Sequence, residues 1–155
     1  MKTSLYCIIT LSALLSSAAF AKPFQQEELV NLSISIKNIP QLKDNKNTAE
    51  VEISLLANAA QWQLDQPPFK VIRLPANSIE LNHTFTRLPA GRYALFAFFD
   101  ANNNQQLDED WLGIPEEAFA FSGMSSLDQE LKFIEASFIV SEKEQSKTLT
   151  LIEMN

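Results

Sequence analysis

Apolar and polar side chains alternate along several short stretches of the chain. Residues 31–37 and 51–55 place an apolar side chain at every second position, and residues 79–85 do so with one histidine in the series. A repeat of two residues is typical of a β-strand that buries one face. These stretches therefore predict strands, and residues 69–74 predict a further extended segment.

The most apolar stretch is Tyr93–Phe99, where both faces of an extended chain would carry apolar side chains. This pattern predicts a central strand that is buried on both sides. Leu88–Gly91 before it predicts a tight turn, because proline presets the backbone and glycine accepts a left-handed exit. Residues 138–140 and 148–152 predict closing strands.

The segments between these strands are polar or irregular. Residues 41–48 predict a hairpin loop, and residues 58–62 predict one helical turn capped by Asn58. For residues 127–136 a strand and a short helix are equal alternatives. Many short strands separated by turns are typical of a sandwich. We therefore predict an all-β protein, an antiparallel β-sandwich of about seven strands with at most one or two short helical turns.

Residues 1–21 have the features of a secretory signal peptide. A lysine near the start is followed by a short apolar run at 5–15, and an A-x-A cleavage motif ends the segment at Ala21. The alternatives are a lipid attached at Cys7 and a buried N-terminal helix. We predict cleavage, a single domain over residues 22–155 with no membrane span, and export to the periplasm or the extracellular space.

Composition narrows the function classes. The chain has 19 acidic and 12 basic residues and a formal charge of −7, so it lacks the excess of Lys and Arg that a nucleic-acid interface needs. A single cysteine excludes a disulfide framework and a zinc site of several cysteines. Eight acidic residues and no Lys or Arg lie between Tyr93 and Leu131. The acidity is therefore concentrated in one segment of the chain.

The loop expected after the central strand carries oxygen-bearing side chains at alternate positions. With the backbone carbonyl of the seventh residue they form a candidate calcium site: Asp100, Asn102, Asn104, Gln106 and Asp108. The loop differs from an EF-hand at its sixth residue, Gln105, where glycine is usual, and at its twelfth, Trp111, where glutamate is usual. Asp110, Glu116 or Glu117 could supply the missing carboxylate. The alternative is an asparagine-rich loop whose side chains cap their own backbone.

Five short motifs follow one another closely between Leu88 and Ser122: Leu88–Ala94, Phe99–Asn104, Leu107–Asp108, Leu112–Glu117 and Phe121–Ser122. In this order they resemble the bacterial family of exported proteins filed as domain of unknown function 2141. The resemblance implies a transthyretin-like or immunoglobulin-like sandwich with no established activity. It also implies that Tyr93 bonds back to the backbone of the corner before it, and that a glycine is usual where this chain has Gln105.

No set of residues in the sequence is clearly typical of a catalytic site. His83 is the one histidine, and its apolar face is typical of a core or rim residue rather than of a catalytic base. A triad would have to join His83 to a serine such as Ser122, and no nucleophile-elbow motif supports that. Glu116 and Glu117 are adjacent and would point apart, which leaves Asp108 with Glu117 as a hydrolase pair. We therefore expect no enzyme.

The sequence favours a binding function. We expect an exported interaction module whose acidic loop, ordered by calcium, presents Trp111 and the turn at residues 113–115 to a protein or another envelope component. We expect a monomer that binds no nucleic acid. Two alternatives are a hydrolase that uses the loop carboxylates and a purely structural envelope domain without a metal.

Overall fold

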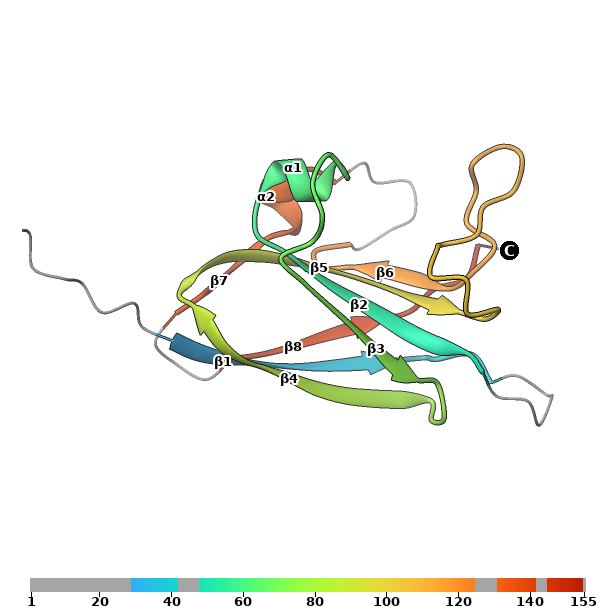
Figure 1. The fold of residues 1–155 in the computed structure, drawn as a ribbon, viewed down its shortest axis with the longest axis horizontal. Helices are drawn as coiled ribbons and strands as arrows, with labels where there is room; N and C mark the ends of the chain where they lie inside the picture. Colours follow the sequence, from blue (N-terminus) through green and yellow to red (C-terminus); the bar gives the residue numbers. More distant parts are fainter. Residues whose placement is uncertain (1–28, 42–47, 125–130, 142–144, 155) are drawn as a thin grey trace, which may run out of the picture.

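The computed structural model describes residues 29–41, 48–124, 131–141 and 145–154. Within these ranges two β-sheets pack face to face (Figure 1). The first sheet has the order β4 (Glu80–Pro89), β1 (Leu29–Lys37) and β8 (Gln145–Thr150). The second has the order β3 (Lys70–Pro75), β2 (Glu50–Leu56), β5 (Gly91–Asp100) and β6 (Phe119–Phe121), and β7 (Phe138–Val140) pairs with the first residues of β5. The predicted all-β sandwich is confirmed.

The pairing is antiparallel except between β1 and β8, which run parallel. β2 and β5 pair from Glu50 opposite Asp100 to Leu56 opposite Ala94, and this is the longest ladder of the second sheet. At the end of β8 the chain crosses toward the second sheet, where Ile152 pairs with Phe119 of β6. The two sheets are therefore joined along one side.

The core lies between the inner faces of the two sheets. The alternation in the sequence sets it, because every second residue of β1 and β2 is buried, as are the inward residues of β5. Its largest fully buried side chains include Leu32, Ile36, Ile53, Leu55 and Leu95. β5 is buried on both faces, as the continuous apolar run predicted.

The outer face of β5 carries a second, smaller apolar cluster. Phe96 stacks on Phe121 of β6 with ring centroids 4.6 Å apart, and Trp62 packs on Phe121 at 5.0 Å. Trp62 belongs to α1 (Ala59–Trp62), and α2 (Phe133–Ala136) covers the same cluster. We call residues 58–66 and 131–137 the helical lobe. Its two parts are joined by a hydrogen bond of 3.0 Å from the Trp62 indole N–H to the Leu131 carbonyl.

Several local predictions are confirmed. The Asn58 side chain accepts a hydrogen bond from the Gln61 N–H and caps α1. The Tyr93 hydroxyl donates to the Pro89 carbonyl at 2.9 Å, which fixes the corner where β4 passes into β5. Of the two alternatives for residues 127–136, the helix is correct for 133–136, and residues 125–130 lie outside the described residues.

Other local predictions need correction. Residues 41–48 do not close a hairpin, because β1 and β2 belong to different sheets; residues 42–47 of this loop lie outside the described residues. β8 begins at Gln145, three residues before the predicted strand, and β6 is a strand that the sequence left irregular. The predicted signal peptide also lies outside the described residues. Within the described part, no helix has the length and apolar character to span a membrane.

Candidate functional site

The acidic loop, residues 100–117, projects from the end of β5 and returns to β6 (Figure 1). The two strands are joined at its base by a hydrogen bond of 2.8 Å from the Phe99 N–H to the Ala118 carbonyl. The loop has two parts, a turn at its base over residues 100–108 and a hairpin beyond it over residues 109–115. In each part, the side chain of one aspartate accepts two backbone N–H groups.

Asp100 organises the base of the loop. Asp100 is 1% exposed, and its two carboxylate oxygens accept the backbone N–H groups of Asn104 at 3.0 Å and Gln105 at 2.8 Å. A charged acceptor for backbone N–H groups forms stronger hydrogen bonds than a neutral one. Asp100 therefore fixes the path of the turn from inside.

Asn102, Asn104 and Asp108 pack together on the exposed side of the same turn. The side-chain amides of Asn102 and Asn104 donate to the Asp108 carboxylate at 2.6 and 2.9 Å. Their carbonyl oxygens accept the N–H groups of Asn104 and Gln106 at 3.0 and 2.9 Å. The loop thus caps its own backbone, which is the arrangement that the sequence offered as the alternative to a metal site.

The predicted calcium ligands are brought together in part. Asp100, Asn102, Asn104 and Asp108 share the turn, and Gln106 takes part through its N–H. Only two of these side chains are carboxylates. Among the described residues no group of three or more His, Cys, Asp or Glu side chains is arranged to hold a metal ion. The calcium site stays a prediction.

Gln105 makes the sharp turn for which a glycine was expected. Its φ angle is 64°, in the left-handed region, and that of Asn103 is 60°. Glycine adopts this region without the steric cost that a Cβ brings. Gln105 therefore carries a steric strain at this position that a glycine would not.

Glu117 closes the loop from the opposite side. Glu117 is 7% exposed, and its carboxylate accepts the N–H groups of Ala101 at 2.8 Å and Asp108 at 3.1 Å. Burial raises the pKa of Glu117, and the charges of Asp108 and Asp100 raise it further, whereas the two N–H groups act in the opposite direction. The sequence named Glu117 only as a spare ligand or catalytic acid. Its role as an anchor was missed, because no local pattern marks a buried glutamate.

This shift predicts a pH dependence of stability. The pKa of Glu117 is higher in the folded state than in the unfolded state. Its contribution to the free energy of unfolding is therefore complete below the unfolded pKa of about 4.3, and it is lost as the pH rises through the folded pKa. Relative to Glu117→Gln, which does not titrate, the wild-type protein should lose stability as the pH rises from about 4.3 toward neutrality. Urea unfolding of both proteins across this range measures the difference, and a difference that is constant or grows in favour of the wild type contradicts the prediction.

The hairpin beyond the turn is held by Asp110. One carboxylate oxygen of Asp110 accepts the N–H groups of Leu112 at 2.8 Å and Ile114 at 2.9 Å. The Asp110 backbone exchanges further bonds with Gly113 and Ile114, and Glu109 pairs with Pro115. These bonds hold a short rigid hairpin without a buried core of its own.

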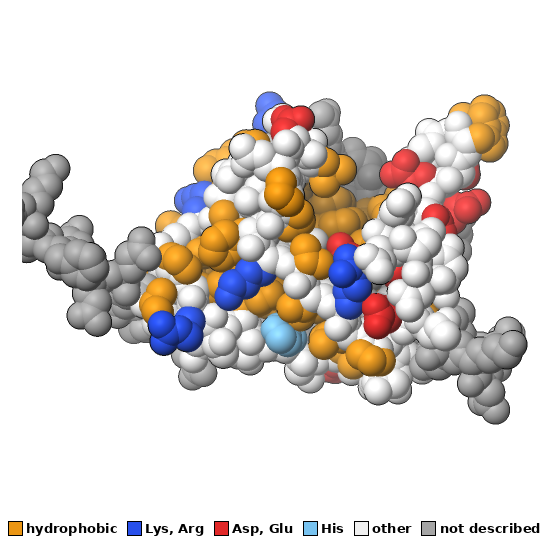
Figure 2. Space-filling model, viewed as in Figure 1, with side chains coloured by type: hydrophobic (Ala, Val, Ile, Leu, Met, Phe, Trp, Pro, Cys, Tyr) orange, Lys and Arg blue, Asp and Glu red, His pale blue; other side chains and the backbone are white. Residues whose placement is uncertain are grey.

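The end of this hairpin exposes three large apolar side chains, which we call the apolar tip: Trp111 is 89% exposed, Leu112 61% and Ile114 40%. Acidic residues flank the tip on both sides in the sequence, at Asp108–Asp110 and at Glu116. Figure 2 shows the apolar side chains at the far end of the projecting loop, with acidic side chains below them. The loop therefore presents an apolar surface on an acidic stem.

The catalytic candidates are not brought together. His83 lies on β4, at one edge of the first sheet, with its ring 5.0 Å from that of Phe85. Burial and the charge of Lys70 lower the pKa of His83. Ser122 follows β6, which is an edge strand of the second sheet, so His83 and Ser122 belong to different sheets. Asp108 and Glu117 are close, but their carboxylates accept hydrogen bonds from the loop itself.

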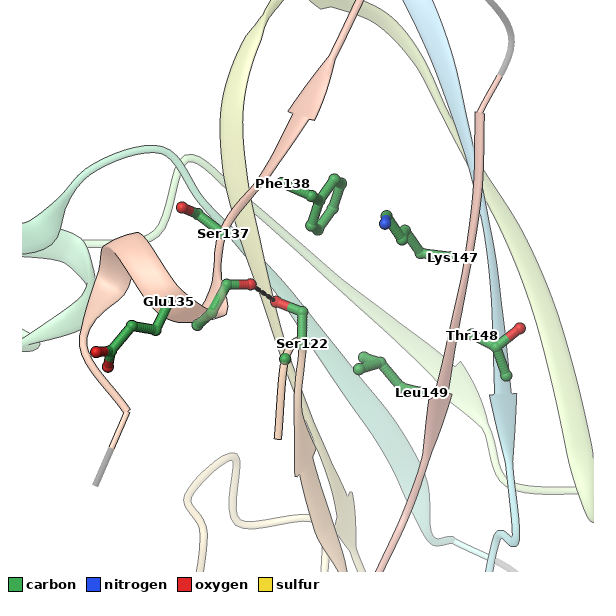
Figure 3. Close-up of a pocket in the computed structure, with 9 residues that line it drawn as sticks. Ser122, Glu135, Ser137, Phe138, Lys147, Thr148 and Leu149 are labelled. Atoms are coloured by element: carbon green, nitrogen blue, oxygen red, sulfur yellow. Dashed lines mark hydrogen bonds between the residues drawn. The ribbon is translucent and has the colours of Figure 1, made fainter. Parts of the chain in front are cut away.

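Ser122 also has a structural role. Its hydroxyl donates to the Ala136 carbonyl at 2.8 Å and accepts the Leu95 N–H at 2.8 Å. It lines a pocket of about 270 Å³ between β7 and β8, shown in Figure 3. Across this pocket the Lys147 ammonium lies 4.6 Å from the centre of the Phe138 ring. Ser122 thus ties α2 to β5.

The fold and the loop define a β-sandwich protein with a projecting, acidic, apolar-tipped loop. The chain belongs to the bacterial family described as "Uncharacterized protein conserved in bacteria (DUF2141)", whose model matches residues 34–148. The resemblance seen in the sequence is confirmed. The comparisons with curated proteins and with solved structures find no match.

Proposed function

We propose that this protein is an exported binding module that holds a partner through the apolar tip. The observation that carries the proposal is the exposure of Trp111, Leu112 and Ile114 at the end of a hydrogen-bonded hairpin. Large apolar side chains gathered on a protruding surface are typical of interaction sites. Tryptophan in particular is enriched among the residues that carry most of the energy of an interface.

The rigidity of the loop supports this role. Asp100, Glu117 and Asp110 each accept two backbone N–H groups, so the hairpin is ordered before a partner binds. A preformed surface loses little conformational entropy on binding. The signal-peptide features of residues 1–21 support export, which places this surface outside the cytoplasm.

Site-specific photocrosslinking in the native bacterial cell tests the proposal. Benzoylphenylalanine in place of Trp111 should give an adduct of one defined mass, because the partner covers this side chain. The same amino acid in place of Ser146, which is exposed on β8, is the matched control and should not give that adduct. Ile114→Asp in the crosslinking chain should abolish it. The recovered chain should begin after Ala21.

Two results would contradict the proposal. One is the absence of any adduct specific to position 111, and the other is an adduct that survives Ile114→Asp. A chain recovered with residues 1–21 intact and inside the cytoplasm would contradict export alone.

Calcium ordering of the loop is a separate proposal, supported by the presence of four oxygen-bearing side chains on one turn: Asp100, Asn102, Asn104 and Asp108. An ion at this place would take carbonyl and carboxylate oxygens that now accept hydrogen bonds. We expect the melting temperature to rise in about 1 mM calcium, the range of weak extracellular sites. Asp100→Ala and Asp108→Asn should remove the rise, and Asp65→Asn should keep it. A melting curve that calcium does not change would exclude the ion.

A further inference from the structure

A second candidate surface lies where the two sheets separate. After β8, the backbone of Ile152 exchanges two hydrogen bonds of 3.0 Å with Phe119 of β6, and these bonds join the sheets. Toward its start, β8 pairs with β1 alone and β7 pairs with β5 alone, as far as the described residues go. Figure 3 shows the pocket that lies between these two edges. The sandwich is therefore open between β7 and the first half of β8.

The backbone of β8 presents a free edge to this opening. The Leu151 N–H donates to the Lys37 carbonyl of β1 at 2.9 Å, whereas Ile152 bonds to β6 on the other side. Backbone groups of successive residues in a strand point to opposite sides. Those of Ser146 and Thr148 therefore point the same way as those of Ile152, and within the described part of the chain no group bonds to them. They are free to pair with another strand.

The pocket beside this edge combines apolar and cationic side chains. Its volume is about 270 Å³, and Phe138 of β7 and Leu149 of β8 lie on its two sides. Figure 3 shows the side chains of Lys147 and Leu149 pointing into the pocket and that of Thr148 pointing away from it. Thr148 therefore lines the pocket with its backbone. A strand added at this edge would place every second side chain over the pocket.

Lys147 gives the pocket a positive charge without a counter-charge. Alternation places Lys147 on the inner face of β8 together with Leu149, which is buried. The Lys147 ammonium lies 4.6 Å from the centre of the Phe138 ring, and none of the described carboxylates forms an ion pair with it. Glu135 also lines the pocket, but its carboxylate accepts the Lys132 backbone N–H and points away from the pocket in Figure 3.

We propose that the opening between β7 and β8 binds an extended acidic segment of another protein, which adds as a strand to the free edge of β8. The backbone of this segment would pair with Ser146 and Thr148, and one of its carboxylate side chains would face Lys147. Strand addition takes its affinity from main-chain hydrogen bonds and its specificity from alternate side chains. The proposal goes beyond the proposed function, because it uses a surface other than the apolar tip.

Charge selects the partner of this edge. A second cation lies at the wall of the pocket, where the Arg92 guanidinium donates to the Ser137 hydroxyl at 3.0 Å. An acidic strand would therefore meet opposite charge. A second copy of β8 would instead bring its own Lys147 to the same face, and like charges on neighbouring strands destabilise their pairing. An inward-pointing charge on an edge strand also protects proteins against pairing between identical edges.

NMR titration of the isotopically labelled chain with a short peptide tests the proposal. The probe is the blocked peptide Thr-Val-Thr-Glu-Thr-Val-Thr, which places its valines and its glutamate on one face of a strand, and the control peptide has Gln in place of Glu. The N–H signals of Ser146 and Thr148 should shift, and their hydrogen exchange should slow. The Glu peptide should bind about tenfold more tightly than the Gln peptide, because hydrogen bonds to a charged group are the stronger ones.

Variants of Lys147 test the role of its charge. Lys147→Met keeps the length of the side chain without the charge, so it should bind the two peptides equally. Lys147→Glu should reverse the preference, and a peptide with Lys in place of Glu should then bind best. Lys37→Met is the matched control, because Lys37 is exposed on the outer face of the same sheet, and it should keep the wild-type preference. The melting temperature of each variant shows that it is folded.

Three results would overturn the proposal. The first is equal binding of the Glu and Gln peptides to the wild type, and the second is an unchanged preference in Lys147→Met. The third is the absence of shifts at Ser146 and Thr148 up to about 5 mM of the Glu peptide. None of these results bears on the crosslinking at position 111, so the failure of strand addition and the failure of the apolar tip as a binding surface can be told apart.

Discussion

Asp100→Ala is expected to lower the free energy of unfolding by about 2–4 kcal/mol. The substitution removes a buried carboxylate, leaves the Gln105 N–H without its acceptor, and leaves the Asn104 N–H with only the Asn102 side-chain oxygen. A buried donor that loses its partner costs about 1–3 kcal/mol, because water does not replace the lost bond. The effect should be larger than that of any exposed residue of the acidic loop.

Urea unfolding of three variants measures this effect. Asp100→Asn keeps the size of the side chain and one oxygen acceptor, so it should cost less than alanine. Asp65→Ala is the matched control, because Asp65 is exposed in the turn after α1 and should change stability by no more than about 0.5 kcal/mol. If Asp100→Ala behaves like this control, the aspartate does not hold the loop.

Hydrogen exchange shows which part of the acidic loop Asp100→Ala destabilises. In Asp100→Ala the Gln105 N–H should lose protection, because its acceptor is gone, and the Asn104 N–H should lose less, because it also bonds to the Asn102 side chain. The N–H groups of Leu112 and Ile114 bond to Asp110 and should keep theirs. A loss spread evenly over the loop would mean that the base and the hairpin form one unit rather than two.

The strands could be predicted from the sequence because each has a local signature. Alternation in β1 and β2 marks one buried face, and the continuous apolar run of β5 marks burial on both faces. The cap of α1 and the corner at Tyr93 also depend on a few neighbouring residues. Such features are local, so a single sequence contains them.

The arrangement of the strands could not be predicted in the same way. A period of two does not say which strand lies beside which, so the parallel pairing of β1 with β8 and the separation of β1 from β2 were not foreseen. These contacts join residues far apart in the chain. The short strands β6 and β7 are held by their pairing with β5 rather than by their own pattern.

The candidate site, like the fold, could be predicted from the sequence only in part. The sequence located the acidic loop and placed Trp111 on it, since both follow from the order of residues, whereas the exposure of Trp111 comes from the structure. It did not show that Asp100 and Glu117 face inward, or that Asp110 holds the hairpin, because burial depends on the rest of the fold. In the helical lobe, a pocket between α1 and the start of α2 is lined by two segments distant in the chain, and no local pattern predicts it.

Gly123→Ala is expected to cost about 2–5 kcal/mol, the second large effect. Gly123 has a φ of 79°, and a Cβ there would lie 2.9 Å from the Glu135 carbonyl oxygen and 3.0 Å from the Ala136 Cα. These are backbone atoms of α2, so a side-chain rotation does not relieve the contact. The substitution must displace α2, which also weakens the Ser122 bond to the Ala136 carbonyl.

Gly113→Ala separates the two causes of this cost. Gly113 has the same φ of 79°, but the nearest atom to its Cβ position is a Glu109 carboxylate oxygen at 4.0 Å. Alanine there should cost only the strain of a left-handed backbone, about 1–2 kcal/mol. Urea unfolding of both variants gives the difference, which reports the close approach of Gly123 to α2. Equal costs at the two glycines would show that α2 moves freely on the sheet.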